Sequence, residues 1–364
     1  MASFSYGKII EMSFNRTVLI LFRPFSLKKW LFLVLIALLS GALGGGGNTN
    51  FSNYSNPKTK SASAVIQYAS ALNLSNIDSG KALRLLKGNL SKRGHFFASG
   101  FTVLLFTSLI IVFIALLILF TWLGARFKFI WYNSIVENDA SVSGPFSRYK
   151  DQGDSLFNFL LLFMAVMIGF LVIIGLWIFA SGTASGIIGG SSSPNFLGFI
   201  TTFIVPLLIL FALIIILSLA MALVDHFVVP IMAMDKCKFK SGVNTFVGIL
   251  KTRINEFLIF ILILIGLGIA AAIAAIFILV ICIVIGLLAA GILFGLPYLL
   301  MVSVMGLGSG AYFIYCFIVG IPFAAVFILM VWCSALPFAV FFRCLSLYFL
   351  SSLDCGYQPL ALEN

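Results

Sequence analysis

The longest uncharged stretch of the chain lies between Glu256 and Arg343, where 86 consecutive residues include no Asp, Glu, Lys, Arg or His. A second such stretch, of 70 residues, lies between Asp154 and Asp225. A helix that crosses the hydrocarbon core of a bilayer needs about 20 predominantly apolar residues. Each stretch can therefore hold at least two membrane-spanning helices.

The composition of the whole chain supports a membrane protein. Of its 364 residues, 62% are apolar and 9% are charged, whereas soluble domains average about 45–50% and about 25%. So few charges cannot cover a globular surface, which excludes a soluble enzyme. An aromatic content of 15% excludes a disordered chain.

The uncharged segments predict an all-α, polytopic transmembrane bundle of about six spans. We expect the helices over residues 28–46, 99–124, 156–180, 197–224, 257–288 and 311–342. Glycines and a proline at 189–194, and glycines at 306–310, are typical of the turns that close two hairpins. Residues 289–305 fit a re-entrant piece, a helix along the interface or a seventh span, and we favour the first two.

The distribution of Lys and Arg predicts the orientation of these helices. The first 29 residues and the segments 125–154 and 225–256 are rich in Lys and Arg, whereas 181–196 and 289–310 have none. Positive charge marks the cytoplasmic side. We therefore expect a protein of the cytoplasmic (inner) membrane with both termini in the cytoplasm.

These assignments divide the chain into five parts. They are a cytoplasmic amphipathic segment 1–27, a hairpin 28–124 with the external loop 48–98, an in-plane segment and hairpin 125–224, a third such unit 225–342, and a cytoplasmic tail 343–364. The loop 48–98 is basic, although its predicted position is external and basic loops favour the cytoplasmic side. Charge in a long loop has less influence on membrane orientation than charge in a short one. The first helix also fits a cleaved signal peptide, although the segment before it is longer than a usual basic leader.

Two segments have the apolar spacing of amphipathic helices that lie in the membrane plane on the cytoplasmic side. One stripe runs through Val243, Phe246, Val247, Leu250 and Ile254, and the other through Tyr6, Ile9, Ile10, Phe14, Val18 and Leu21. Their basic faces would meet water and headgroups. A surface helix, a span out and a span back then occur three times in order, which suggests three tandem hairpin repeats. Phe127, Phe146 and Phe157 have counterparts at 227, 246 and 257, but identity over this window is near chance.

Candidate functional residues lie at the ends of the predicted spans. Asp225 and His226 close the fourth span, where they could transfer protons or anchor the helix through an ion pair, and we favour the anchor. Lipid headgroups or a partner subunit would contact the basic residues Lys240, Lys251, Arg253, Arg126 and Lys128. The net charge of +11 is assigned to these lipid contacts rather than to nucleic acid.

Chemistry that needs a nucleophile, a metal or a cofactor has little support. The chain has two histidines and no zinc, phosphate-loop or nucleophile-elbow motif. Six cysteines show no C-x-x-C spacing and mostly occupy apolar runs. We expect no catalytic residue, no metal and no cofactor.

Several short motifs together resemble a known group of proteins. They are LFRPFSLKKW at 21–30, VDHFVVPIM at 224–232, LPF at 336–338 and FRC at 342–344, with the segment 126–159. The chain resembles an uncharacterised family of prokaryotic polytopic membrane proteins, similar to the membrane domain fused to some glycerophosphodiester phosphodiesterases. The resemblance implies an inner-membrane helix bundle, and the sequence offers no separate phosphodiesterase domain.

We expect a non-enzymatic structural or accessory component that contacts lipid, another membrane subunit or a second copy of itself. The alternative is a transporter or channel-like permease for an apolar or amphipathic substrate, with a cavity lined by Thr201, Thr202, Ser218, Tyr312 and Tyr315. A third class, a lipid-modifying enzyme, would require Asp225, His226 and another polar side chain to converge on one pocket.

Overall fold

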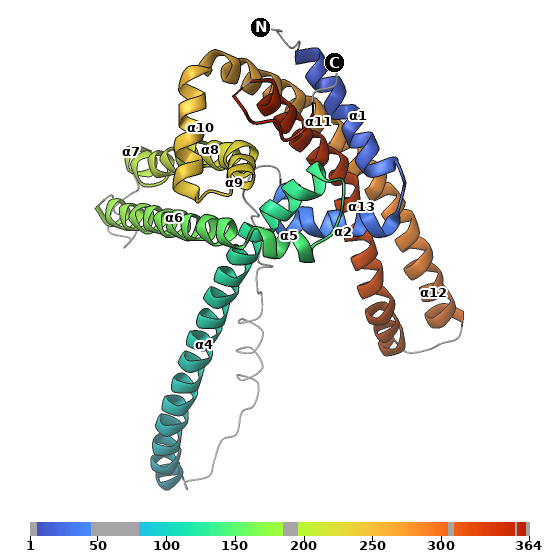
Figure 1. Ribbon diagram of the computed structural model, residues 1–364. Helices are drawn as coiled ribbons and strands as arrows, with labels where there is room; N and C mark the ends of the chain where they lie inside the picture. The colour runs from blue at the N-terminus through green and yellow to red at the C-terminus, as the bar shows by residue number, and fades with distance from the viewer. Residues whose placement is uncertain (1–5, 45–79, 185–195, 305–308, 354, 362–364) are drawn as a thin grey trace. The chain divides into compact units, whose positions relative to one another are not determined.

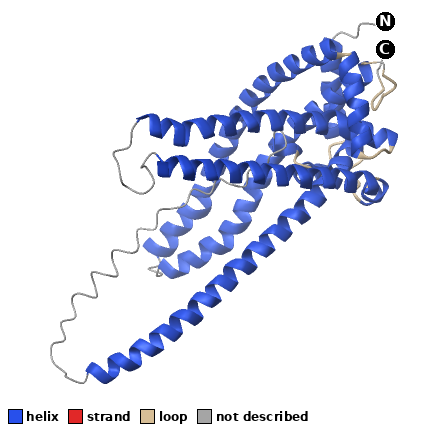
Figure 2. Ribbon diagram, turned by 90° about the vertical axis from the view of Figure 1, so that its left-hand side faces the viewer, coloured by secondary structure: helices blue, strands red, loops and turns tan. Residues whose placement is uncertain are grey.

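The computed structural model describes residues 6–44, 80–184, 196–304, 309–353 and 355–361, which contain helices and no strand (Figures 1 and 2). The chain forms two compact units, Thr49–Phe120 and the remainder, Met1–Asn48 with Thr121–Asn364. The second of these holds the packed core. The all-helical class predicted from the sequence is confirmed for the described residues.

The described helices follow one another along the chain in this order. They are α1 (Tyr6–Phe22), α2 (Leu27–Leu39), the 3₁₀ turn η1 (Ala42–Gly44), α4 (Gly80–Val136), α5 (Ser143–Arg148), α6 (Lys150–Ala184), α10 (Phe239–Thr252) and α13 (Ser309–Ser352). Two further rods combine α-helix with π-helical turns. One contains α7 (Phe196–Phe199), η2 (Ile200–Ile204), α8 (Val205–Leu223), η3 (Val224–Val228) and α9 (Val229–Asp235), and the other contains α11 (Ile254–Ala290), η4 (Gly291–Gly295), α12 (Leu296–Tyr298) and η5 (Leu299–Val304).

Five of these rods are long and apolar enough to cross a membrane. The candidate spans are Leu104–Val136, Lys150–Thr183, Leu197–Asp235, Ile254–Met301 and Tyr312–Ser352. By length and composition the chain is therefore a multi-pass membrane protein. The rod of α8 lies beside α6, and the rod of α11 lies beside α13, as antiparallel hairpins (Figure 1).

The expected first span, 28–46, differs from the described helix. α2 has 13 residues, a length of about 20 Å, which is shorter than the roughly 30 Å hydrocarbon core. It stops at Ser40, because Gly41 follows in the left-handed region with φ 79°. Leu33 and Ile36 are fully buried, and the helix packs on α13. Residues 45–79, which include much of the expected loop 48–98, lie outside the described residues, and the six-span count stays a prediction.

Residues 289–304 continue the α11 rod through η4, α12 and η5. They neither turn back nor separate from it, so they form an extension of the fourth candidate span, which reaches Met301. The structure therefore differs from the two favoured predictions for this segment, a re-entrant piece and a separate in-plane helix. Helical backbone accommodates Gly291 and Gly295 within this rod.

Three of the π-helical turns lie directly ahead of a proline. η2 precedes Pro206, η3 precedes Pro230 and η4 precedes Pro297. A proline in a helix lacks an N–H, and its ring clashes with the carbonyl four residues earlier. A widened turn relieves this clash, and it leaves carbonyl oxygens without their usual helical donors.

Side chains from neighbouring helices donate to these carbonyls. The bonds are Trp177 Nε1 to Thr201 O at 3.2 Å, Tyr315 OH to Leu293 O at 2.8 Å, Tyr312 OH to Phe294 O at 3.0 Å, and Arg343 Nη1 to Asp225 O. An unpaired carbonyl is costly in a membrane, so a nearby donor makes the proline tolerable. At these three prolines, therefore, hydrogen bonds link neighbouring helices of the bundle.

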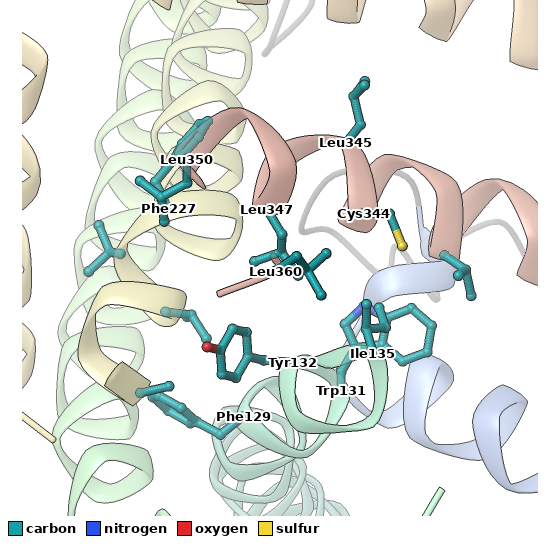
Figure 3. Close-up of a cluster of buried hydrophobic side chains, with 14 of the residues drawn as sticks. Phe129, Trp131, Tyr132, Ile135, Phe227, Cys344, Leu345, Leu347, Leu350 and Leu360 are labelled. Carbon is teal, nitrogen blue, oxygen red and sulfur yellow. The ribbon is translucent and has the colours of Figure 1, made fainter. Parts of the chain in front are cut away.

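The buried core gathers at one end of the hairpins, where α4, η3, α9, α11 and α13 meet. Phe227 lies within 5.1 Å of Phe257 and 5.8 Å of Phe260 between ring centroids, and Phe260 stacks on Phe349 at 3.9 Å. We call these four phenylalanines, with Phe246, the phenylalanine core. Figure 3 shows Tyr132 of α4, Phe227 of η3 and Leu347 of α13 gathered in the adjoining part. The most apolar windows of α6 and α13 contain no buried residue.

The helix α1 packs on α13 through a face that the sequence predicted in part, since Ile9 and Leu21 of the predicted stripe are buried. Phe14, expected in the apolar stripe, is 61% exposed, whereas Ser13 and Thr17 are buried. Ser13 Oγ donates to the Ile9 carbonyl and Thr17 Oγ1 to the Ser13 carbonyl, both at 2.7 Å. Because these hydroxyls are satisfied by their own helix, they can enter the core at little cost.

Candidate functional site

Asp225 is the residue at which three long helices are linked. Its carboxylate forms an ion pair with Lys128 of α4, and its carbonyl accepts a hydrogen bond from Arg343 of α13. His226 Nδ1 lies 3.0 Å from Ser346 Oγ, also on α13. We call these five residues the Asp225 junction. It connects the end of the fourth predicted span to the ends of the second and the sixth.

Local sequence explains the position of this junction. Pro230 imposes the π-helical turn η3, which leaves the Asp225 carbonyl available, and Phe227 fixes the turn in the phenylalanine core. Arg343 is only 4% exposed, lies 6.0 Å from the Tyr132 ring, and has an Nε without a hydrogen-bond partner among the described residues. Such a buried cation is tolerated only where neighbouring polar groups offset its desolvation.

The junction does not have the geometry of a catalytic triad. Asp225 bonds to Lys128 and is not paired with His226, so it does not orient the imidazole. Ser346 is 1% exposed, and its hydroxyl donates to the Arg343 carbonyl at 2.9 Å. Among the described residues, no three His, Cys, Asp or Glu side chains gather as a metal site. The ion pair of Asp225 with Lys128 is the contact that the anchoring interpretation of Asp225 expects.

Arg126 takes part in a second internal ion pair. Its Nη2 lies 2.8 Å from Asp154 Oδ1, and its guanidinium lies 4.4 Å from the Trp122 ring centroid and 4.8 Å from that of Phe146. Arg126 is 8% exposed, and the Lys128 side chain is 13% exposed. Both residues had been predicted to contact headgroups or a partner, whereas in the structure their charges are paired within the chain.

The helix α10 presents the remaining predicted contact residues. Gly242, Phe246 and Ile249 are buried, and the opposite face is exposed. We call this exposed face, formed by Lys240, Asn244, Val247, Gly248 and Lys251, the α10 outer face. Arg253 bonds to Glu256 at 3.1 Å. The predicted stripe therefore differs from the buried face, because Val247 and Ile254 are exposed.

The C-terminal segment folds back on the same region. Tyr357 OH donates to Asp235 Oδ2 at 2.7 Å, and the buried Ser351 donates to the Leu360 carbonyl at 3.0 Å. Burial and the Asp235 carboxylate raise the pKa of Tyr357 to about 12. The described part of the predicted tail 343–364 is thus packed, and α13 itself extends to Ser352.

Four of the five hydroxyls predicted to line a transport cavity donate to backbone carbonyls. Thr201 donates to the Leu197 carbonyl at 3.0 Å, Ser218 to the Ile215 carbonyl at 2.9 Å, and Tyr312 and Tyr315 to the carbonyls near Pro297. Thr202 is buried. Arg343 and Ser346 were not predicted as site residues, although Arg343 is the charge that ends the longest uncharged stretch.

Comparison with known proteins gives one result. A family model described as a family of unknown function (DUF7544) matches residues 8–360, nearly the whole chain. No curated protein and no solved structure matches it.

Proposed function

Because the chain belongs to this family of unknown function (DUF7544), whose description assigns no activity, we propose its function from its structure. It is a non-enzymatic membrane protein that acts as a structural or accessory component and contacts lipid or a partner subunit. The resemblance to the membrane domain of glycerophosphodiester phosphodiesterases is part of this proposal, as are the inner-membrane location and the cytoplasmic termini.

The observation that supports the proposal most strongly is that the buried core and the most apolar stretches of the helices are formed by different residues. Most fully buried side chains lie in α1, in α2 and near the ends of the long helices, whereas the most apolar windows of α6 and α13 contain no buried residue. The charges of Arg126 and Asp154, and those of Lys128 and Asp225, are paired within the chain. Such a molecule exposes apolar helix surface that lipid or a partner helix can contact, which supports a structural or accessory role.

The three-repeat organisation is proposed with it. Phe127 and Phe227 are both buried, and each follows a basic residue at the end of a long helix. Phe146 lies 4.8 Å from Arg126, and Phe246 lies 5.6 Å from Phe227. In both units, therefore, the short helix after the span packs on the same part of the span end.

Replacing Lys240 and Lys251 by Gln is expected to weaken the preference for anionic lipid. Both lysines are exposed on the α10 outer face, and a lysine near an anionic surface contributes about 1 kcal/mol. From vesicles of mixed phosphatidylglycerol and phosphatidylcholine, the protein is extracted with its surrounding lipid, and the lipid ratio is measured. The two lysines together contribute about 2 kcal/mol, so the enrichment of phosphatidylglycerol should fall roughly thirtyfold.

The matched control replaces the same two lysines by Arg, which keeps the charge. This variant should retain the enrichment. If the Gln variant retains it as well, the α10 outer face is not a lipid contact, and that part of the proposal is rejected.

A further inference from the structure

A cavity of about 330 Å³ opens between the start of α2 and the link from α4 to α5. This volume is at the lower end of the roughly 300–1,000 Å³ usual for small-molecule sites. The cavity is lined by Pro24, Ser26, Lys28, Lys29, Phe32 and residues 138–141. None of these residues belongs to the Asp225 junction or to the α10 outer face.

Hydrogen bonds between the two segments hold the cavity in shape. Lys29 Nζ donates to Asn138 Oδ1 at 2.8 Å, across 109 positions of sequence. Asn138 has a positive φ of 55°, which turns the chain sharply after α4. Trp30 Nε1 donates to the Leu21 carbonyl at 2.7 Å and fixes α2 to the end of α1. The site is therefore preformed rather than assembled by a ligand.

The charge of the cavity favours an anion. Lys28 and Lys29 supply two positive charges, and Asp139 supplies one negative charge. Lys28 is exposed and makes no ion pair or hydrogen bond among the described residues. Arg23 is also exposed, directly before Pro24. A phosphate group would satisfy these donors, since lysine binds phosphate as a point charge.

An apolar stripe begins beside the cavity and follows α2. Leu27 is 69% exposed, and Leu31 and Leu35 are each 46% exposed, at the i, i+4 spacing of one helix face. Phe32, which lines the cavity, is 40% exposed. Exposed apolar side chains next to lysines match a molecule with a charged head and hydrocarbon chains.

We propose that this cavity binds the phosphate of a phospholipid, with the acyl chains lying along Leu31 and Leu35. This inference deepens the proposed function and depends on its premise that the chain contacts lipid. A free phosphate ion shares the chemistry of the headgroup, but the apolar stripe favours the lipid.

The test is native mass spectrometry of the full-length protein, delipidated in detergent and titrated with phosphatidylglycerol. The wild type should retain a discrete lipid adduct. Lys28→Gln should weaken that adduct about fivefold, the effect of one lysine beside an anionic headgroup, and Lys28→Arg should keep it. Lys150→Gln, at another exposed lysine, should have no effect. An equal loss in Lys28→Gln and Lys150→Gln, or no loss in either, would overturn the site.

Two further arms separate the possible explanations. Inorganic phosphate should not displace the lipid adduct; displacement at millimolar phosphate would assign the cavity to the free ion and overturn the lipid proposal. Lys240→Gln with Lys251→Gln should leave this adduct intact. If it does, while Lys28→Gln fails to weaken the adduct, the cavity proposal fails and the wider lipid-contact function stands.

Discussion

Replacing Phe227 by Ala is expected to destabilise the protein by about 3–5 kcal/mol, the usual cost of deleting a buried phenyl ring. Phe227 is 1% exposed and contacts four other phenylalanine rings at 5.1 to 6.0 Å between centroids. Its loss leaves a cavity where η3, α10, α11 and α13 meet. Reversible unfolding in mixed micelles, followed by tryptophan fluorescence, measures the change in free energy.

The control is Phe211→Ala in α8, on the same rod as Phe227. Phe211 is 62% exposed within the protein, so the substitution removes a ring that contacts lipid or detergent and not a ring in a packed core. We expect a change below about 1 kcal/mol, because apolar side chains gain little by moving from lipid into protein. Equal losses in the two variants would contradict a core confined to the helix ends.

Asp225→Asn is the second substitution expected to have a large effect. It removes the carboxylate that pairs with Lys128 and leaves that lysine beside the buried Arg343. Breaking a fully buried pair costs about 3–5 kcal/mol. Since the two side chains are 26% and 13% exposed, water screens part of this cost, and we expect about 2–3 kcal/mol in the same unfolding assay.

The exposed pair between Glu137 and Arg148 provides the control. Its side chains are 46% and 54% exposed, so Glu137→Gln should cost less than about 1 kcal/mol. Adding Lys128→Met to Asp225→Asn should recover stability, because the unpaired charge is then removed. A double variant as unstable as the sum of the single variants would show that the ion pair is not the source of the effect.

Hydropathy predicted most of the helical regions, because a helix that crosses a membrane needs a long, continuous apolar stretch and such a stretch is visible in the sequence. The helix expected from Lys240 to Ile254 is α10, Phe239–Thr252. Its inward face was predicted only in part, because the spacing of Val243, Phe246 and Val247 fits contact with lipid as well as contact with protein. Only the position of the phenylalanine core decides that Phe246 and Ile249 are buried and Val247 is exposed.

The sequence predicted that Asp225 would form an ion pair, but it did not predict which residues would be its partners. Asp225 was expected to pair with a nearby cation, and that cation is Lys128, 97 residues earlier. The role of Arg343 follows from Pro230, whose π-helical turn offers a carbonyl that sequence patterns do not reveal. Arg126 was predicted to contact headgroups. Its partner Asp154 and its aromatic neighbours come close to it only in the folded chain, so the sequence alone did not reveal the internal ion pair.

The most direct test of the central claim is quenching of single tryptophans by brominated lipids. Trp177 in α6 is 53% exposed, and Trp131 in α4 is 4% exposed beside the Asp225 junction. In two variants that each retain one of these residues, bromine on the acyl chains should strongly quench Trp177 and leave Trp131 almost unchanged. Protection of Trp177 together with quenching of Trp131 would place the packed core along the spans and contradict the account.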